Sequence, residues 1–224
     1  MKAQFFAFAL LLVWGFAPPA QKEEHSKSLE PALRDLASGK GWSVINRQVS
    51  LQADKGQEFV RMSEGPGAGV ALLDSVEFPR GVIELDLRGK NVVQKSFIGV
   101  AFHVSTDTSY ECIYFRPFNF RSADSAARGH AVQYINAPSY GWKRLRTEHP
   151  GDYENRINPP PEPDSWFHSR IVVTRAEVEV FVNGADKPSL RVNRLTSAER
   201  GAIGLWVGDD SGGDFANFKI SVEK

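Results

Sequence analysis

Three consecutive pieces of sequence decide the fold: SFIGVAFHV (96–104), STDTS (105–109) and YECIYFRPF (110–118). The first and third are rich in β-branched and aromatic residues, and the five polar residues between them are typical of a hairpin connection. The stretch therefore predicts two antiparallel strands. Pairing Val104 with Tyr110 would set His103 opposite Glu111.

The two faces of this hairpin are expected to differ, because side chains alternate across a sheet. One face would carry His103, Gly99, Ala101, Glu111, Ile113 and Phe115, and the other Val100, Phe102, Val104, Tyr110, Cys112 and Tyr114. The second set is apolar and predicts core. In the first set, the two small residues would leave room for a ligand beside the polar pair.

The polar pair is the candidate catalytic group, with Glu111 as the acid/base and His103 tuning it. The alternative is a cross-strand pair on a solvated face, which stabilises a sheet modestly. Cys112, the single cysteine of the chain, would point away from His103. A buried, unreactive thiol is therefore expected rather than a Cys–His nucleophile.

The rest of the chain after residue 40 continues in the same manner, with short β-rich runs bounded by Gly, Pro, Asn and Asp. Ten strands are expected: 58–62, 70–73, 81–87, 97–104, 110–116, 131–135, 168–174, 177–182, 201–207 and 215–222. No helical period is visible there. The pattern predicts an all-β, antiparallel sandwich or jelly roll, as a single domain over residues 42–224.

The N-terminus reads as an export signal over residues 1–20. Lys2 precedes an apolar run, and small residues follow it. A short transmembrane anchor is the alternative, but the run is shorter than the roughly 20 residues that a spanning helix needs. Residues 21–41 are expected to form a linker with a short helical turn. The mature protein would then be periplasmic or secreted, from a bacterium, without a stable membrane span.

The charge balance gives no support for nucleic acid as a partner. Lys and Arg together number 27, as do Asp and Glu, and there is no basic block. No cofactor is expected, with calcium at the acidic turn described below as the alternative.

A long connection at residues 136–164 has no clear periodicity, and loops of this length are often binding loops or lids. Within it, APSYGWKRLRTEHPGDYEN (137–155) interleaves aromatic rings with arginines, groups that stack on sugar rings and hold hydroxyls or carboxylates. The expected ligand-binding residues are Arg116, Asn119, Gln133, Tyr140, Trp142, Arg144 and Arg146. The alternatives are a decorative insertion, or tryptophans such as Trp142 and Trp166 that anchor the loop to the core.

Five pieces of the chain resemble the concanavalin A-like lectin/glucanase superfamily: FPRGVIELDLRG (78–89), FIGVAFHV (97–104), YECIYFRPFNF (110–120), WFHSRIVVTRAEVEVFVNG (166–184) and GAIGLWVGDDSGGDFANFKI (201–220). Within it they are similar to laminin-G-like modules and to the bacterial 3-keto-disaccharide hydrolase family. The resemblance implies a jelly-roll fold and specifies activity poorly.

The hydrolase resemblance can be carried over to individual residues. Glu111 falls on the Glu of the family's YE-x-Q pattern, His103 on the Arg of F-x-F-R, and Asn217 on the Asn of a final F-R-N. Two glutamines of the pattern are replaced here by Ile113 and Trp206, which departs from the hydrolase pattern.

Two acidic stretches also have counterparts in the superfamily. IELDLR (83–88) matches the Glu-x-Asp-x-Glu strand of laminarinase-type glycosidases, but Arg88 replaces the third carboxylate, which favours a solvated strand face. The turn with Asp209, Asp210 and Asp214 resembles the calcium loops of laminin-G modules. An ordinary Asp/Gly turn is the alternative there, because calcium needs six or more oxygen ligands.

The sequence therefore predicts an extracytoplasmic β-sandwich that binds carbohydrate. Two alternatives stay open: a glycoside-processing enzyme that uses Glu111 and His103, and a laminin-G-like domain that binds proteins.

Overall fold

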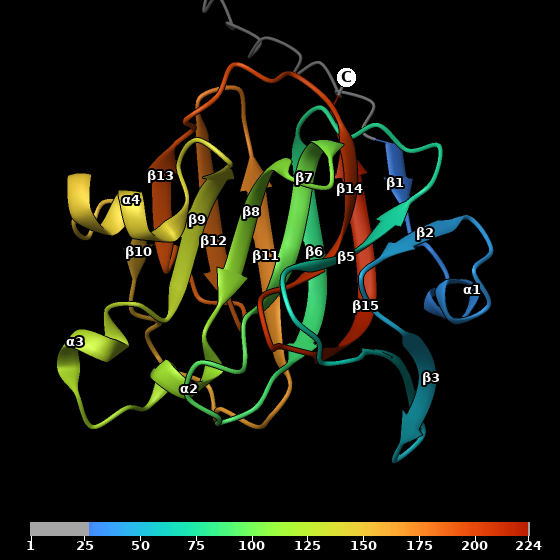
Figure 1. Cartoon of the computed structure of the whole chain (residues 1–224), viewed down its shortest axis with the longest axis horizontal. Coiled ribbons are helices and arrows are strands. Elements are labelled where there is room, and N and C mark those ends of the chain that lie inside the picture. Colours follow the sequence, from blue (N-terminus) through green and yellow to red (C-terminus); the bar gives the residue numbers. More distant parts are fainter. Residues whose placement is uncertain (1–26, 224) are drawn as a thin grey trace, which may run out of the picture.

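The structure is a computed structural model that describes residues 27–223. Two antiparallel β-sheets pack face to face in this part of the chain, and short helices lie around their edges (Figure 1). The expected all-β sandwich is confirmed. The expected export signal, residues 1–20, lies outside the described residues.

Fifteen strands make up the two sheets of the described chain. Sheet A contains, in spatial order, β13 (Leu190–Asn193), β12 (Glu177–Val182), β11 (Phe167–Val173), β6 (Gly81–Arg88), β15 (Gly213–Val222), β4 (Gln57–Met62) and β3 (Val49–Asp54), and β1 (Lys27–Leu29) also pairs with β15. Sheet B contains β10 (Glu154–Asn155), β9 (Val132–Ala137), β8 (Ser109–Phe115), β7 (Ile98–Thr106), β14 (Ala202–Val207), β5 (Gly69–Leu73) and β2 (Trp42–Ile45).

All ten expected strands are present. Five further strands, β1, β2, β3, β10 and β13, are not predicted from the sequence. They are between two and six residues long, and β3 is largely exposed. An exposed or very short strand lacks the apolar alternation on which strand prediction depends.

The helices are α1 (Leu33–Ala37), α2 (Pro117–Phe120), α3 (Ser125–Arg128) and α4 (Trp142–Glu148). The expectation of no helix after residue 40 is wrong, because α2, α3 and α4 are only four to seven residues long and carry no detectable helical period. No helix within residues 27–223 is long and apolar enough to cross a membrane.

Residues 27–41 pack against the sandwich. The expected helical turn is α1, whose Leu36 is buried in the main core, and β1 extends sheet A along β15. The domain boundary at residue 42 stays a prediction.

The main core lies between the sheets. Burial alternates along β6, so that Ile83, Leu85 and Leu87 face inward. Phe115 of sheet B meets Phe167 of sheet A with ring centroids 5.0 Å apart. Burial of such side chains contributes about 1.5–3 kcal/mol each to folding.

A second apolar cluster covers the face of sheet B that points away from sheet A. Its buried members are Val70, Ala101, Val104, Cys112, Tyr114, Ile135, Leu145 and Trp206. All except Leu145 come from sheet B itself. Leu145 belongs to α4, which lies beside β9 and β10 (Figure 1).

The expected register of the β7–β8 hairpin is wrong by one residue. Phe102, not His103, lies opposite Glu111, and Thr106 pairs with Ser109 across a two-residue turn. The cause is an irregularity in β7, where His103 has a φ of +48°. Such bulges add residues to one strand and re-aim side chains.

The observed register changes which residues of β7 share a face with which residues of β8. Glu111 points inward with Ile113 and Phe115, as Val100 and Phe102 do on β7. Cys112 and Tyr114 point outward into the second apolar cluster. Gly99 and Ala101 pair with Tyr114 and Cys112 and therefore lie on the outward face, not beside Glu111.

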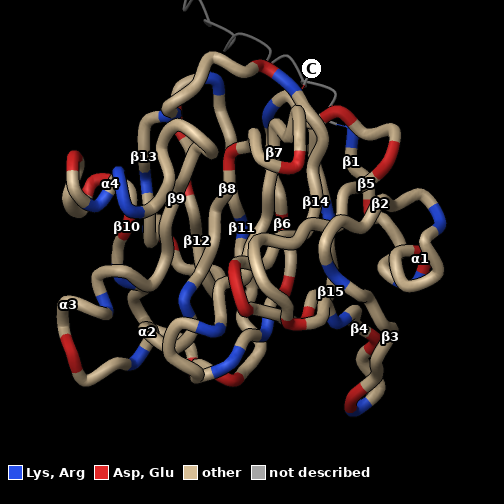
Figure 2. Tube along the Cα trace, in the orientation of Figure 1, with Lys and Arg blue, Asp and Glu red and all other residues tan. Residues whose placement is uncertain are grey.

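Charged residues of both signs are interspersed along the trace (Figure 2).

Candidate functional site

One row of paired residues crosses the outward face of sheet B from edge to edge. Going from β10 to β2, it consists of Glu154, Gln133, Tyr114, Gly99, Trp206, Val70 and Ile45. The rings of Tyr114 and Trp206 lie 5.3 Å apart, on either side of Gly99. Aromatic side chains therefore fill the space that the glycine was expected to leave for a ligand.

The β10 end of this row is polar. Gln133 Oε1 accepts hydrogen bonds from the Tyr114 hydroxyl at 2.7 Å and from Nη2 of Arg116 at 2.5 Å. Arg116 also donates to the Tyr114 hydroxyl at 2.6 Å and to the carbonyl of His130 at 2.8 Å. Arg146, from α4, holds Glu154 through two hydrogen bonds of 2.9 and 2.7 Å.

Three of the expected ligand-binding residues, Arg116, Gln133 and Arg146, thus belong to one cluster, although 30 positions separate the first from the last. We call this group the edge cluster, consisting of Tyr114, Arg116, Gln133, Arg146 and Glu154. Asn119 lies beside it, with Nδ2 3.4 Å from the carbonyl of His130.

The deeper members of the edge cluster are shielded from water. Gln133 is fully buried, and Arg116 and Glu154 are 5% and 4% exposed. Burial lowers the pKa of Arg116 and raises that of Tyr114. The Nε2 atom of Gln133 is buried without a hydrogen-bond partner among the described residues, and an unpaired buried donor costs about 1–3 kcal/mol.

His130 and Glu154 also lie close together. The Nδ1 atom of His130 is 2.9 Å from Oε1 of Glu154, but not in the orientation of a hydrogen bond. Burial lowers the pKa of His130, and nearby Glu154 opposes that shift.

Helix α4 carries the exposed part of the candidate site. Trp142 is 51% exposed, an unusual state for the largest apolar side chain. The guanidinium of Arg146 lies 5.3 Å from the ring of Trp142, and that of Arg144 lies 4.5 Å from the ring of Tyr140. Since Glu154 fixes Arg146, the tryptophan is held against a restrained cation. The α4 face is defined here as Tyr140, Trp142, Arg144 and Arg146.

The two tryptophans of the loop hypothesis differ in their surroundings. Trp166 packs against Phe59 and the guanidinium of Arg88 on sheet A. Trp142 packs against Arg146 alone among the ring contacts of the described chain.

The candidate catalytic residues lie elsewhere, between the sheets. Nδ1 of His103 is 2.6 Å from Oε1 of Glu111, and Nε2 of His103 is 2.7 Å from the carbonyl oxygen of Pro79. Arg194 donates to both carboxylate oxygens of Glu111, at 3.1 and 2.7 Å, and the Tyr134 hydroxyl donates to Oε2 at 2.6 Å.

All four side chains of this interior cluster are buried, and Glu111 is 1% exposed. Burial acts to raise the pKa of Glu111, but hydrogen bonds from His103, Arg194 and Tyr134 outweigh it and hold that pKa below its ordinary value. The carboxylate is therefore ionised and its oxygens are occupied by protein donors.

Arg194 also forms part of a surface depression of about 390 Å³, whose lining includes Pro79, Arg80, Arg175 and Glu199. A molecule in this depression would meet the guanidinium of Arg194 before the carboxylate of Glu111.

The acidic turn does not bring its three carboxylates together. Asp209 accepts a hydrogen bond from the backbone of Gly67, whereas Asp214 is paired with Arg61 and Arg88. Within residues 27–223, no three His, Cys, Asp or Glu side chains are grouped as a metal site would require.

Sequence reasoning missed Tyr114 and Glu154 of the edge cluster and the neighbouring His130, and it missed Tyr134 and Arg194, which bond to Glu111. Glu154 lies within the quoted loop, but its pairing with Gln133 depends on a two-residue strand. Arg194 is 83 positions from Glu111, and no local pattern connects them.

No protein-family model matches the chain, and no curated protein matches it. Several solved structures, however, have a fold similar to that of this chain. The carbohydrate-binding module CBM66 from Bacillus subtilis has a TM-score of 0.57 at 14% identity, covering 80% of this chain and 95% of that one. A protein of unknown function with a galectin-like fold, also from Bacillus subtilis, has a TM-score of 0.54 at 14% identity, covering 88% and 100%.

A third similar structure is the Ca²⁺-bound exoplasmic/lumenal domain of VIP36, with a TM-score of 0.52 at 12% identity, covering 90% of this chain and 93% of that one. At such identities the likeness concerns the fold alone. The protein therefore has an antiparallel, jelly-roll β-sandwich fold like that of these structures, and the sequence predicts this fold class.

Proposed function

We propose that this protein binds carbohydrate, and that the α4 face is its contact surface. The observation that carries the proposal is Trp142, half exposed and backed by an arginine that Glu154 fixes in place. A rigid, exposed aromatic ring beside guanidinium groups suits the C–H face and the hydroxyls of a sugar.

The edge cluster would supply the polar depth of such a site. Arg146 belongs to both groups, so a sugar stacked on Trp142 would lie next to the Arg146–Glu154 pair. The fold adds support of a coarser kind, since similar structures include a carbohydrate-binding module and a carbohydrate recognition domain.

The enzymatic alternative is a glycoside-processing activity with Glu111 as the acid/base and His103 tuning it, as the resemblance to 3-keto-disaccharide hydrolases implies. For that role, a substrate would have to displace Arg194, which now occupies both oxygens of Glu111. The burial of this pair favours a structural role, and the binding function is the better supported.

The remaining parts of the proposal rest on sequence. Export to the periplasm or the medium depends on residues 1–20, and protein binding in the manner of laminin-G modules depends on the family resemblance. Calcium at the turn with Asp209, Asp210 and Asp214 rests on the family resemblance alone.

A glycan array with the mature protein tests the proposal. We expect binding to one or a few glycans, and loss of that signal in Trp142→Ala. Val93→Ala is the matched control, because Val93 is also apolar and exposed, at 68%, but lies in another loop. Product analysis of every bound glycan, with Glu111→Gln alongside, separates binding from turnover. A protein that binds no glycan but captures a defined protein would favour the laminin-G-like alternative.

A further inference from the structure

The outward face of sheet A carries a second group of functional side chains, which the α4 proposal does not use. Nδ1 of His168, on β11, lies 2.8 Å from Oδ1 of Asp86, on β6. The other oxygen of Asp86 accepts a hydrogen bond of 2.6 Å from Nδ2 of Asn217, on β15. Three neighbouring strands thus build one hydrogen-bonded chain, and it orients the imidazole.

An irregularity in β15 produces this arrangement. Ala216 pairs with Asp86 and Lys219 with Glu84, so that Asn217 and Phe218 together stand opposite a single residue. Phe218 enters the main core, and Asn217 has a φ of +51° and is exposed. A non-glycine residue in this backbone region at a bulge is a device that often re-aims a side chain at a functional site.

The second ring nitrogen of His168 is left for a ligand. Its Nε2 lies 3.7 Å from Oε1 of Glu84, which is too far for a hydrogen bond. The side chain of His168 is 40% exposed, and those of Glu84 and Asp86 are 31% and 22% exposed. Its main-chain N–H is fixed separately, by Oδ1 of Asn183 at 2.8 Å.

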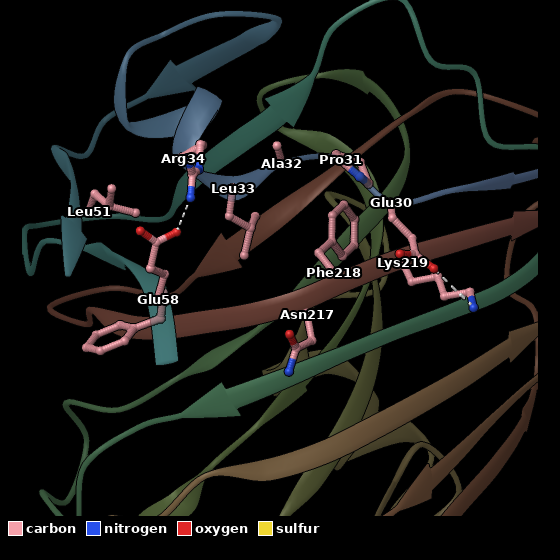
Figure 3. A pocket seen from close by; sticks show the side chains of 11 residues that line it. Glu30, Pro31, Ala32, Leu33, Arg34, Leu51, Glu58, Asn217, Phe218 and Lys219 are labelled. Carbon is pink, nitrogen blue, oxygen red and sulfur yellow. Dashed lines mark hydrogen bonds and ion pairs between the residues drawn. The ribbon is translucent and has the colours of Figure 1, made fainter. Parts of the chain in front are cut away.

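A pocket adjoins this group. It has a volume of about 380 Å³ and is lined by Asn217 and Lys219 together with apolar side chains that include Leu33 and Leu51. Two ion pairs, Arg34–Glu58 and Glu30–Lys219, lie at its opposite ends (Figure 3). Asn217 therefore stands between the pocket and the oriented imidazole.

We propose that His168, Glu84 and Asn217 form a second ligand site, separate from the α4 face, that binds a neutral, polyhydroxylated molecule of saccharide size. Nε2 of His168 and Oε1 of Glu84 are spaced so that adjacent hydroxyls can bond to both, and the amide of Asn217 directs the ligand toward the pocket. Asp86 is a positioning residue, because it touches His168 and Asn217 rather than the ligand.

The mixed chemistry of the group favours this class of ligand. Charges of both signs meet here, because Glu84 lies opposite Lys219 on β15 and Arg170 on β11. Hydroxyls suit such a surface, since they both donate to carboxylates and accept from amides and imidazoles. The proposal does not depend on the α4 site, since the two lie on opposite sheets of the sandwich.

This site is tested by titrating the full-length mature protein with maltose, cellobiose, lactose and sucrose. The readout is the NMR signals of histidine side chains and backbone amides. With at least one of these sugars, we expect saturable shifts at His168 and Asn217. Glu84→Gln, which is nearly isosteric and partly exposed, should weaken that binding at least tenfold, and Asn217→Gly should do so while accepting the positive φ.

The control variant is Trp142→Ala, which should leave these shifts unchanged even if it abolishes binding at α4. The proposal is overturned if none of the four sugars gives saturable shifts at this face, or if Glu84→Gln and Asn217→Gly both bind as the wild type does. A loss confined to Trp142→Ala would leave the α4 site standing and remove this one.

Discussion

The Nδ1 atom of His103 lies 2.6 Å from Oε1 of Glu111, and both side chains are buried. The pair occupies the space between the sheets, and Arg194 bonds to both carboxylate oxygens. Two residues that looked like a ligand-facing pair in the sequence are thus part of an internal charge network.

Removal of Arg194 should therefore destabilise the fold strongly. Arg194→Ala leaves the ionised Glu111 without its main counter-charge, and breaking a buried ion pair costs about 3–5 kcal/mol. Arg175→Ala is the control, because Arg175 is 80% exposed and surface changes usually stay within about 0.5 kcal/mol. Urea unfolding measures both. A loss below about 1 kcal/mol for Arg194→Ala would contradict the structural role.

Cys112 should be unreactive in the native protein. It is fully buried in the second apolar cluster, and burial raises the pKa of its thiol. Thiol labelling should be very slow in native buffer and rapid in denaturant, and Cys112→Ala should cost about 1–2 kcal/mol. Fast labelling of folded protein would mean that the outward face of sheet B is open to solvent at this point.

The contrast between Cys112 and its neighbours shows what the sequence could and could not predict. Alternation along YECIYF correctly separates Cys112 from Glu111, and correctly gives a buried thiol. Which face points at sheet A is not decided by alternation here, because both faces are apolar and both are buried. An apolar run gives a strand without giving its orientation.

The register error has a different cause. The bulge occurs at His103, which has a positive φ, whereas glycine is the residue most often found at positive φ. The sequence therefore gives no signal for the bulge. Long-range partners such as Arg194 are likewise set by the folded sheet rather than by neighbouring sequence. By contrast, Arg116, Gln133 and Arg146 are three of the seven expected ligand-binding residues, and these three lie together. Their binding role stays a prediction.

Gly99 tests the corrected register. A Cβ at this position would lie 2.0 Å from the carbonyl oxygen of Ile113, on the paired strand. Gly99→Ala should cost about 1–3 kcal/mol through overpacking. At Gly65, an added Cβ would meet the nearest atom of Arg47 at 3.4 Å, so Gly65→Ala should be tolerated. Equal thermal midpoints for the two variants would show that the close approach at Gly99 does not exist.

The His168–Asp86 pair should make stability depend on pH. The hydrogen bond to Asp86 raises the pKa of His168, so its contribution is present below the unfolded value of about 6.5 and is lost as pH rises through the folded value. Burial acts to raise the pKa of Asp86, but the hydrogen bonds from His168 and Asn217 outweigh burial, and the net effect lowers that pKa. That contribution is present above about pH 3.9 and is lost on acidification.

The pair therefore stabilises the fold most between about pH 4 and pH 6.5. His168→Gln should lower the free energy of unfolding at pH 5.5, by less than about 1 kcal/mol because the pair is partly exposed. The difference from the wild type should shrink at pH 8.5. A difference that grows with pH, measured by urea unfolding, would reverse the sign of this account.

The central claim is carbohydrate binding through Trp142, and it is tested most directly by calorimetric titration with the strongest glycan from an array. Wild type and Val93→Ala should bind equally, and Trp142→Ala should bind at least tenfold more weakly, a loss of about 1.4 kcal/mol. The thermal midpoint of Trp142→Ala should equal that of the wild type, since the Trp142 ring is half exposed. Equal affinity of the wild type and Trp142→Ala for that glycan would contradict the claim.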